Sequence, residues 1–558
     1  MSKYYFFDSS FISEEKNTAL RLATPEKATT SASWIDPMET NRRDDIPDWE
    51  YRVSILYPFV IFDEEGISVD GVSPAKYKLW YESSAIKDYD TGRRWLDYII
   101  DKKNSKGVEL GDFENIAKGS ISKVHPEFHF ALCYMESNDG INWERPNCGE
   151  FYYKKQDGRI IGTNIVFIGE HGEGVVKNTH PLAGKGEPRY LFGCAHDGFA
   201  ISASDDGIHW EKPIIVFGEH QCPVQVRCDT QNHLYWSKEA GRYVIITRGI
   251  EFDKEEPLRS VLTIPGPSRL CPEESKSSTD LSGSVGSFIY PFVTLDGPVD
   301  AQPYSMPVCR LSDGYYIGLV SMFNYDGASP DPYHVYGALA WSRDLINWKY
   351  LCPNEPFIAN ADEFKFERGN DYGMIYCASP ITVDGKMRIY YAAIPEGHYF
   401  KYDHIPESYK KGVDIALPRA KAEKQITRTT ALNYATVDID RFVGLYSEEG
   451  VVCTKSSAVE GGIKITADIL SGGSITARLL DEDGKVIEGF GYGDFSEIKA
   501  SVTNENLVWR GDLRALKDKK VKIEFSLKNA VIYAYESDGA ESVSADSEKL
   551  PPLIVVPK

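Results

Sequence analysis

Short runs in which apolar and polar residues alternate recur from residue 57 to residue 437. Each run is rich in Val, Ile, Tyr and Phe and is bounded by Gly, Asp, Asn or Pro, the pattern typical of β-strands joined by turns. Clear examples are YPFVIFD (57–63), RYLFGCA (189–195), RYVIITR (242–248), YYIGLVSMF (315–323) and MRIYYAAI (387–394). Residues 91–103, TGRRWLDYIIDKK, instead predict a short amphipathic helix. The pattern as a whole predicts an all-β chain.

A turn motif repeats without gaps in three places, at 137–143, 204–210 and 342–348. In each copy a Ser is followed two residues later by Asp and six residues later by Trp, and the copies start 67 and 138 residues apart. The Ser and Asp side chains can bond nearby backbone amides, and the Trp can pack between neighbouring units. A unit of about 68 residues with four short strands predicts a five-bladed β-propeller. The copy expected near residue 272 lacks the motif.

The predicted propeller spans residues 1–438, with insertions at 85–128 and 250–290. From residue 439 to 558 apolar and polar residues still alternate, but the Trp motif is absent. This second region predicts a C-terminal β-sandwich domain, so the expected fold is a five-bladed β-propeller followed by a β-sandwich.

Charge and composition narrow the classes of partner. The chain of 558 residues has a formal net charge of −21, which argues against a nucleic acid or an anionic membrane as partner. No run of about 18 apolar residues and no signal-like N-terminus occurs, and the ten Cys have no zinc-type spacing. We therefore expect a cytoplasmic protein with reduced thiols and with no metal and no cofactor. A homo-oligomer formed through the acidic C-terminal domain is left open.

Candidate chemistry follows from propeller geometry, because the starts of the innermost strands line one central funnel. Carboxylates lie in or before the predicted first strands of several blades. We predict catalytic roles for Asp229, Glu50 and one of Glu367 or Asp371, since glycoside hydrolysis needs one carboxylic acid and one carboxylate. Substrate-binding roles are predicted for polar and aromatic residues near the same strands: Arg52, Glu173, His180, Gln231, Arg248, Tyr304 and His398.

The runs DTQNHLYWSKEAGRYVIITR (229–248) and DIDRFVGLYSEEGVVCTK (438–455), together with the Trp motif, resemble bacterial relatives of the family 43 and family 32 glycoside hydrolases. The resemblance implies a five-bladed propeller enzyme that cleaves a glycosidic bond in an oligosaccharide, a furanoside among the candidates. In the family 43 pattern Asp229 takes the blade-3 carboxylate role. Two alternatives stay open: a glycoside phosphorylase or transferase with a phosphate pocket formed by Arg52, Arg227, Arg248 and Arg368, and a non-catalytic carbohydrate-binding propeller.

Overall fold

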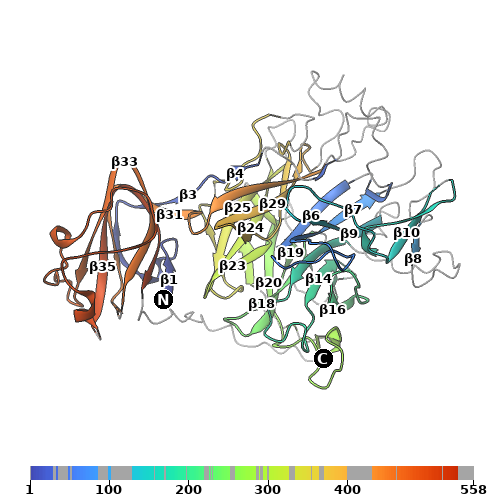
Figure 1. Cartoon of the computed structure of the whole chain (residues 1–558), viewed down its shortest axis with the longest axis horizontal. Coiled ribbons are helices and arrows are strands. Elements are labelled where there is room, and N and C mark those ends of the chain that lie inside the picture. The colour runs from blue at the N-terminus through green and yellow to red at the C-terminus, as the bar shows by residue number, and fades with distance from the viewer. Residues whose placement is uncertain are drawn as a thin grey trace.

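The structure is a computed structural model in which β-strands dominate. It describes residues 2–28, 33–34, 48–50, 53–85, 99–101, 129–155, 157–168, 171–195, 198–218, 225–226, 228, 230–251, 258–284, 288, 293–297, 301–325, 333–353, 355–363, 370–398, 430–459, 461–517 and 519–537. Within these ranges the helices are short 3-10 turns such as Asp48–Glu50. The prediction of an all-β chain is confirmed (Figure 1).

The strands after residue 52 form successive antiparallel units, each a meander of neighbouring strands. The first two units are regular four-stranded sheets. Unit 1 contains β6 (Val53–Phe62), β7 (Tyr77–Ala85), β9 (His129–Ser137) and β12 (Ile165–Ile168). Unit 2 contains β13 (His171–Lys177), β14 (Tyr190–Ala195), β15 (Gly198–Ser204) and β16 (Ile214–Gly218).

In the next three units the first strand is split into two short pieces. Unit 3 contains β17 (Gln225–Val226), β18 (His233–Ser237), β19 (Arg242–Glu251), β20 (Leu258–Pro265) and β21 (Val293–Asp296). Unit 4 contains β22 (Ala301–Ser305), β23 (Val308–Ser312), β24 (Tyr315–Tyr325), β25 (Tyr333–Ser342) and β26 (Trp348–Leu351). Unit 5 contains β27 (Met374–Cys377), β28 (Ile381–Val383), β29 (Lys386–Ile394) and β30 (Ala431–Asp438).

Neighbouring units contact one another through their first strands. Strand β6 contacts β13 of unit 2, β13 contacts β18 of unit 3, and β19 and β20 contact β22 of unit 4. One parallel residue pair, Val335 with Met374, joins β25 to β27, and β27 and β28 in turn contact β6. Unit 1 therefore contacts both unit 2 and unit 5. The chain's β4 (Glu26–Lys27) and β5 (Ser33–Trp34) pair with β30 and complete unit 5 from the N-terminal side.

The repeated turn has the local hydrogen bonds that its residues predict. The Oδ1 atom of Asp139 accepts from the two following amides, Ile141 and Asn142, at 2.7 Å each. The equivalent oxygens of Asp206 and Asp344 accept from their own following amides at 2.8 Å. Gly140 in this turn has a φ of +74°, which a glycine adopts without strain.

Each of these turns also joins its unit to the preceding one. The carbonyl of Gly140 accepts from Tyr390 of unit 5 at 2.9 Å, and that of Gly207 accepts from Trp80 of unit 1 at 2.7 Å. In unit 4 the carbonyl of Asp344 accepts from Ser237 of unit 3 at 2.8 Å. The motif therefore has the architectural role expected of it.

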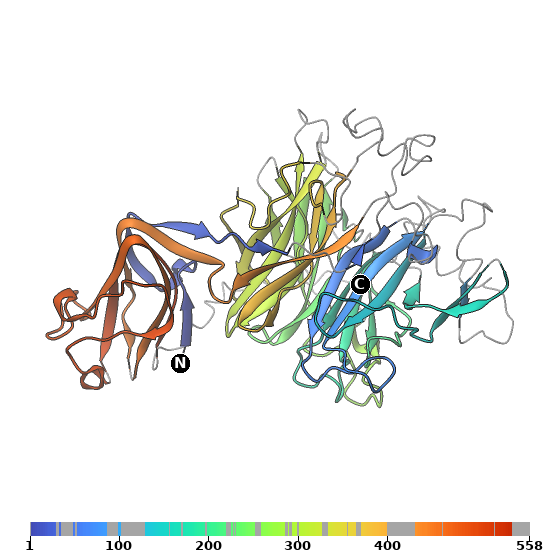
Figure 2. The same cartoon turned by 45° about the horizontal axis from the view of Figure 1, so that its top comes forward.

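The C-terminal region forms one strongly bent eight-stranded sheet at one end of the molecule, separate from the five units (Figures 1 and 2). Its long strands are β31 (Val443–Thr454), β33 (Ile463–Leu480) and β35 (Lys520–Ser537), with β34 (Val502–Asn506) and β32 (Ser457–Ala458) at the edges. The N-terminal strands β1 (Ser2–Tyr5), β2 (Ile12–Lys16) and β3 (Ala19–Leu22) pair with β35 and β31. The first 22 residues are thus part of this sheet rather than of the five units. The predicted domain boundary at 438/439 stays a prediction.

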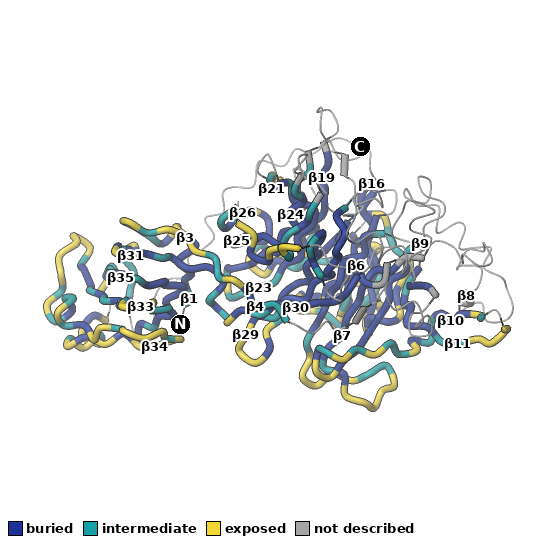
Figure 3. The backbone as a smooth tube through the Cα atoms, turned by 90° about the horizontal axis from the view of Figure 1, so that it is seen from above, coloured by how far each residue is buried: buried dark blue, intermediate teal, exposed yellow. Residues whose placement is uncertain are grey.

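The N-terminal segment also connects this sheet to unit 4. Asp8, buried, forms an ion pair with Arg343 and accepts a hydrogen bond from Tyr315 at 3.1 Å. Tyr5 donates to Asp440 at 2.7 Å. Figure 3 shows buried backbone running through both parts of the molecule, with exposed residues concentrated in the turns.

The predicted helix at 91–103 is wrong where the structure describes it. Ile99–Asp101 is strand β8, which pairs with β10 (Phe151–Lys154), and β11 (Ile160–Gly162) lies on the other side of β10. The two isoleucines of this strand favour an extended conformation once a partner edge is available, because tertiary pairing overrides weak local periodicity.

Candidate active site

Two glutamates from neighbouring units lie together and are almost fully buried. Glu82 on β7 and Glu173 on β13 are each 1% exposed. The Nδ1 atom of His171 lies 2.9 and 3.0 Å from the two carboxylate oxygens of Glu82, and the backbone amide of Gly172 donates to Glu82 at 2.6 Å. Gly172 has a φ of +73°, and a side chain there would collide with the carbonyl of Thr230. This glycine therefore permits the close approach of β13 to the backbone of Thr230 in unit 3.

Both carboxyls bind protons more tightly than ordinary glutamates. Burial raises the pKa of Glu82 from 4.5 to about 7, although the amide of Gly172 acts in the opposite direction. Burial, followed by the nearby charge of Glu82, raises the pKa of Glu173 well above 4.5. Neither carboxyl oxygen of Glu173 has a hydrogen-bond partner of good geometry within the described part of the chain. At neutral pH this pair therefore holds at least one proton, which is the state required of a general acid.

The raised pKa of Glu82 predicts a pH-dependent stability that Glu82→Gln should remove. Between pH 4.5 and 7 the unfolded chain loses this proton while the folded protein keeps it, so the free energy of unfolding falls as pH rises. We expect the stability of E82Q relative to the natural protein to rise by about 1–3 kcal/mol from pH 5 to pH 7.5. Thermal unfolding of both proteins across this range measures the difference. If the stabilities of the two proteins changed with pH in parallel, the raised pKa of Glu82 would be contradicted.

Three tyrosines from three units pack together beside the carboxyl pair. The ring of Tyr57 on β6 lies 5.3 Å from that of Tyr376 on β27 and 6.0 Å from that of His171. The ring of Tyr304 on β22 lies 5.6 Å from Tyr376. Tyr57 has a φ of +49°, and the strand register is irregular on both sides of it. A buried, bulky residue held in this conformation stores strain, a feature that clusters at functional sites.

Basic groups lie on the far side of Tyr304. The guanidinium of Arg248 lies over the Tyr304 ring at 4.4 Å, and Nε2 of His398 is 3.0 Å from the Tyr304 hydroxyl. Burial would raise the pKa of Tyr304, but the charge of Arg248 and hydrogen bonds from Arg248 and Tyr57 outweigh it and lower that pKa. We name the set drawn from all five units the central cluster: Tyr57, Glu82, His171, Glu173, Arg248, Tyr304, Tyr376 and His398.

Four of the residues predicted from sequence thus lie in the central cluster: Glu173, Arg248, Tyr304 and His398. A fifth, Gln231, connects three units. Its amide nitrogen donates to the carbonyl of Cys377 at 3.2 Å, and its amide oxygen accepts from Ser305 at 3.0 Å. These bonds occupy both ends of the amide, so Gln231 joins unit 3 to units 4 and 5.

Glu50 and Asp371 lie in ion pairs with other partners. Glu50, 0% exposed, accepts from Arg145 at 2.7 and 2.9 Å and from Tyr81 at 2.6 Å. Tyr81 and Glu82 are adjacent on β7, so Glu50 lies on the face of the strand opposite to Glu82. Asp371 pairs with Lys27 of β4 at 2.6 Å and accepts from Tyr391 at 3.0 Å.

Three other candidates, Arg52, Asp229 and Glu367, lie outside the described residues. The catalytic roles of Glu50, Asp229, Glu367 and Asp371 therefore stay predictions.

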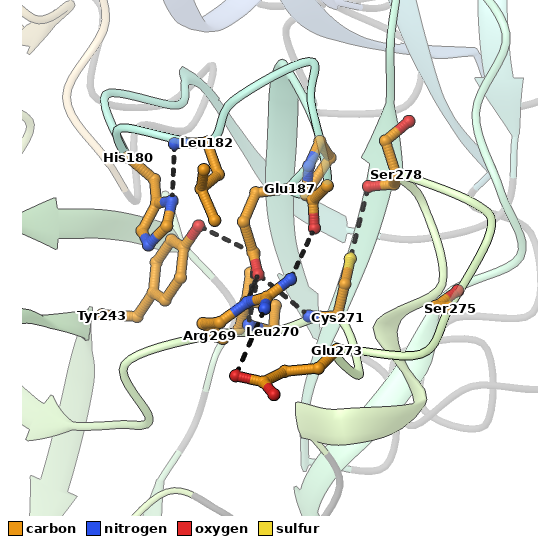
Figure 4. A network of polar contacts seen from close by, with 12 residues as sticks. His180, Leu182, Glu187, Tyr243, Arg269, Leu270, Cys271, Glu273, Ser275 and Ser278 are labelled. Atoms are coloured by element: carbon orange, nitrogen blue, oxygen red, sulfur yellow. Dashed lines mark hydrogen bonds and ion pairs between the residues drawn. The ribbon is translucent and has the colours of Figure 1, made fainter.

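His180 belongs to a different network, shown in Figure 4. Its Nδ1 accepts from the amide of Leu182 at 3.0 Å, its ring stacks on Tyr243 at 5.6 Å, and burial lowers its pKa. The buried carboxylate of Glu187 accepts from Tyr243 at 3.0 Å and from the amides of Leu270 and Cys271. Tyr243 and Arg248 are five residues apart on β19, or about 16 Å along the strand. The structure therefore does not bring His180 to the central cluster.

Sequence reasoning assigned no role to the other four members of the central cluster, which are Tyr57, Glu82, His171 and Tyr376. Glu82 lies in the apolar run YKLWYES (77–83) and shares its strand face with Trp80, a position where a carboxylate is costly unless it has a role. That cost is a usable sequence signal. Tyr57 has no such signal, because only its backbone conformation distinguishes it.

The described residues hold no group of three or more His, Cys, Asp or Glu side chains arranged to bind a metal ion. Over the same residues no helix has the length and apolar character needed to cross a membrane.

Solved structures similar to this chain include glycoside hydrolases. A glycosyl hydrolase from Bacteroides ovatus is 13% identical with a TM-score of 0.38, over 75% of this chain and 94% of that one. A thermostable family-43 glycoside hydrolase is 9% identical with a TM-score of 0.35, over 70% and 92% of the two chains. A structure from the GH130 family of mannoside phosphorylases, which contains hydrolases of β-1,2 mannosidic linkages in Candida mannan, is 13% identical with a TM-score of 0.36, over 68% and 92%.

No protein-family profile and no curated protein matches the chain by sequence. At these identities and TM-scores, any statement about substrate or catalytic residues rests on the site of this chain and not on the similar structures.

Proposed function

We propose that this protein hydrolyses a glycosidic bond in an oligosaccharide at the central cluster. The observation that carries the proposal is the buried Glu82–Glu173 pair, which retains a proton at neutral pH. The Glu173 carboxyl is buried and interacts with Glu82, and neither of its oxygens has a partner of good hydrogen-bond geometry among the described residues. A sugar hydroxyl or a glycosidic oxygen would supply such a partner. The contacts that connect unit 1 to units 2 and 5 support an arrangement of the five units as propeller blades around this cluster.

In the proposed reaction the carboxyl pair acts as one general acid. Glu173 donates its proton to the leaving oxygen, and Glu82, held by His171 and Gly172, adjusts the proton affinity of Glu173. A separate carboxylate must then attack the sugar or activate water. Asp229 is our proposal for that role, because its chain neighbours Cys228 and Thr230 are buried and Thr230 packs on Gly172. The distance from Asp229 to the acid would decide between retention and inversion.

A substrate screen with the full chain tests the proposal. Aryl furanosides, aryl pyranosides and unmodified oligosaccharides are incubated at pH 5 to 8, with and without inorganic phosphate, and the released sugars are quantified. We expect release of a free sugar that does not depend on phosphate. Formation of a sugar phosphate only when phosphate is present would indicate a phosphorylase instead. Absence of turnover on every substrate class would contradict an enzymatic role.

A further inference from the structure

Two buried tyrosines of the central cluster are joined by a hydrogen bond. Tyr57 on β6 of unit 1 donates to the phenol oxygen of Tyr304 on β22 of unit 4. The rings of both pack against Tyr376, at 5.3 and 5.6 Å. Because both side chains are buried, the groups around each oxygen decide which of the two phenols keeps its proton.

The surroundings shift the pKa values of the two phenols in opposite directions. Burial, followed by the nearby charges of Tyr304 and Tyr376, raises the pKa of Tyr57 well above 10. Burial acts in the same sense on Tyr304, but the charge of Arg248 and the hydrogen bonds from Arg248 and Tyr57 outweigh it and lower the pKa of Tyr304. Neighbouring titratable groups that are shifted apart in this way take different protonation states and different chemical roles. Of the two phenols, Tyr304 is therefore the one that ionises.

Three hydrogen-bonding groups from three other units meet at the Tyr304 oxygen. Nε2 of His398, which follows β29 of unit 5, lies 3.0 Å from it. Arg248 on β19 of unit 3 bonds to it, with the guanidinium 4.4 Å from the ring centre, and Tyr57 of unit 1 completes the set. With a proton on Nε2, His398 is a donor like the other two, and a phenolate accepts from all three. A neutral phenol must use one of these directions for its own proton.

Further titratable groups lie on the elements around this oxygen. The charge of Arg259 on β20 also lowers the pKa of Tyr304. Glu396, buried two residues before His398, lies on the same segment of unit 5. The pKa of Tyr304 stays below its ordinary value with all of these groups in place.

The backbone of Tyr57 indicates that the position of its hydroxyl is constrained. Its φ of +49° lies in the left-handed region, and β6 departs from regular register on both sides of it. A bulky residue is held in this conformation only where the surrounding structure over-determines it. The charge of Glu82 also acts on Tyr57, so this phenol connects the acid pair to Tyr304.

A negative oxygen in the central cluster fits the chemistry of glycosidic cleavage. Positive charge develops on the sugar ring as the leaving oxygen takes up a proton. An anion that the fold already holds in place stabilises such a charge, because its surroundings need not reorganise during the reaction. The Glu82–Glu173 pair supplies the proton, and Tyr304 belongs to the same cluster.

We propose that Tyr304 is a phenolate near neutral pH and that its negative oxygen stabilises the oxocarbenium-like transition state of glycosidic cleavage. The ionised state is a property of the resting protein and is measured without a substrate. The catalytic role rests on the proposed function, and it leaves the attack on the sugar to Asp229.

Ultraviolet difference spectra of the full chain test the ionised state, because a phenolate and a phenol absorb at different wavelengths. The natural protein, Y304F and the matched control Y390F are compared at pH 8, where tyrosines with a pKa of about 10 keep their protons. Tyr390 is also buried beside an arginine: its hydroxyl donates to the carbonyl of Gly140 at 2.9 Å and lies 3.2 Å from Nη1 of Arg388. Burial nevertheless raises the pKa of Tyr390.

We expect the spectrum of the natural protein minus that of Y304F to show a phenolate band, and the spectrum minus that of Y390F to show a phenol band. A phenol band in both difference spectra overturns the proposal. If Y304F does not fold, pH titrations of Y57F and R248M carry the comparison. The phenolate absorption that the natural protein shows at pH 8 should appear only at higher pH in both variants. Its absence from the natural protein, or an unchanged titration in both variants, overturns the proposal.

Kinetics on the best substrate of the screen test the catalytic role. In Y304F we expect kcat to fall about 10²-fold and KM to change only a few-fold, because the positive charge is present in the transition state alone. A substrate with a good leaving group should not restore the rate of Y304F, since charge develops on the sugar whichever group leaves. A phenolate band together with an unchanged kcat in Y304F would overturn the catalytic role. Absence of turnover in the screen would instead remove the hydrolase and leave the ionised tyrosine standing.

Discussion

Replacing Glu173 by Gln is expected to lower the rate of glycoside hydrolysis at least about 10³-fold while the protein stays folded. The amide cannot release a proton to the leaving oxygen, and loss of general-acid catalysis typically costs 10²- to 10⁴-fold. Folding should be retained, because Gln has the same shape and removes a buried carboxyl that repels Glu82. Steady-state kinetics on the best substrate of the screen, with circular dichroism as a check of folding, measure both expectations.

The matched control is Glu136→Gln. Glu136, on β9 of unit 1, is buried as Glu173 is, but it accepts hydrogen bonds from Ser68, the amide of Val69 and Tyr134, away from the central cluster. This variant should keep its rate within a few-fold of the natural protein. Equal rates for E173Q and the natural protein would remove Glu173 from the mechanism. An E173Q variant whose activity returned with a substrate bearing a good leaving group would support the acid role, because such a group needs no proton.

Breaking the Arg145–Glu50 pair should have the largest effect on stability. Arg145→Met removes a cationic partner from the Glu50 carboxylate, which is 0% exposed, and removing one member of a buried pair typically costs about 3–5 kcal/mol. Because Arg145 itself is 26% exposed, water can reach part of the site, and we expect the lower end of that range. Urea unfolding monitored by Trp fluorescence measures the loss.

Two further variants separate structure from catalysis at this pair. Glu50→Gln should also destabilise the protein. The folded fraction should retain most of its activity if the role of Glu50 is to form the ion pair with Arg145. A folded E50Q protein with a rate lowered by orders of magnitude would instead support the catalytic role predicted from the sequence. Asp157→Asn, which breaks an exposed pair with Arg159, should leave the stability almost unchanged.

The elements that could be predicted from sequence are those stabilised over a few residues. The turn at Ser137 is one example: its side-chain oxygen accepts from the amide of Gly140, three residues on, and such a bond needs nothing from the rest of the fold. Alternation of apolar and polar residues likewise predicted the strands, because it reflects which side chains face inward. The regular spacing of the turns predicted a repeating unit of about 68 residues, and the five-bladed propeller built from that unit stays a prediction.

The site was predictable only in part for the opposite reason. Glu173, Arg248, Tyr304 and His398 were identified because they flank predicted strands. Glu82 was missed because its role depends on Glu173, which lies 91 positions later in the chain. The sequence around β7 does not show that the fold brings these two residues together. Glu50 was identified as a funnel residue, yet its partner Arg145, 95 residues away, lies on the opposite face of β7 from Glu82.

Sequence by itself therefore determined the strands, the repeated turns, the all-β class and four members of the central cluster. Tertiary structure alone decided which carboxyls meet, which arginine neutralises which glutamate, and that the first 22 residues join the C-terminal sheet. The physical reason is the separation along the chain between the groups that interact. Hydrogen bonds within a turn depend on neighbours in the chain, whereas the pairing of strand edges and the burial of charges depend on surfaces that exist only after the chain has folded.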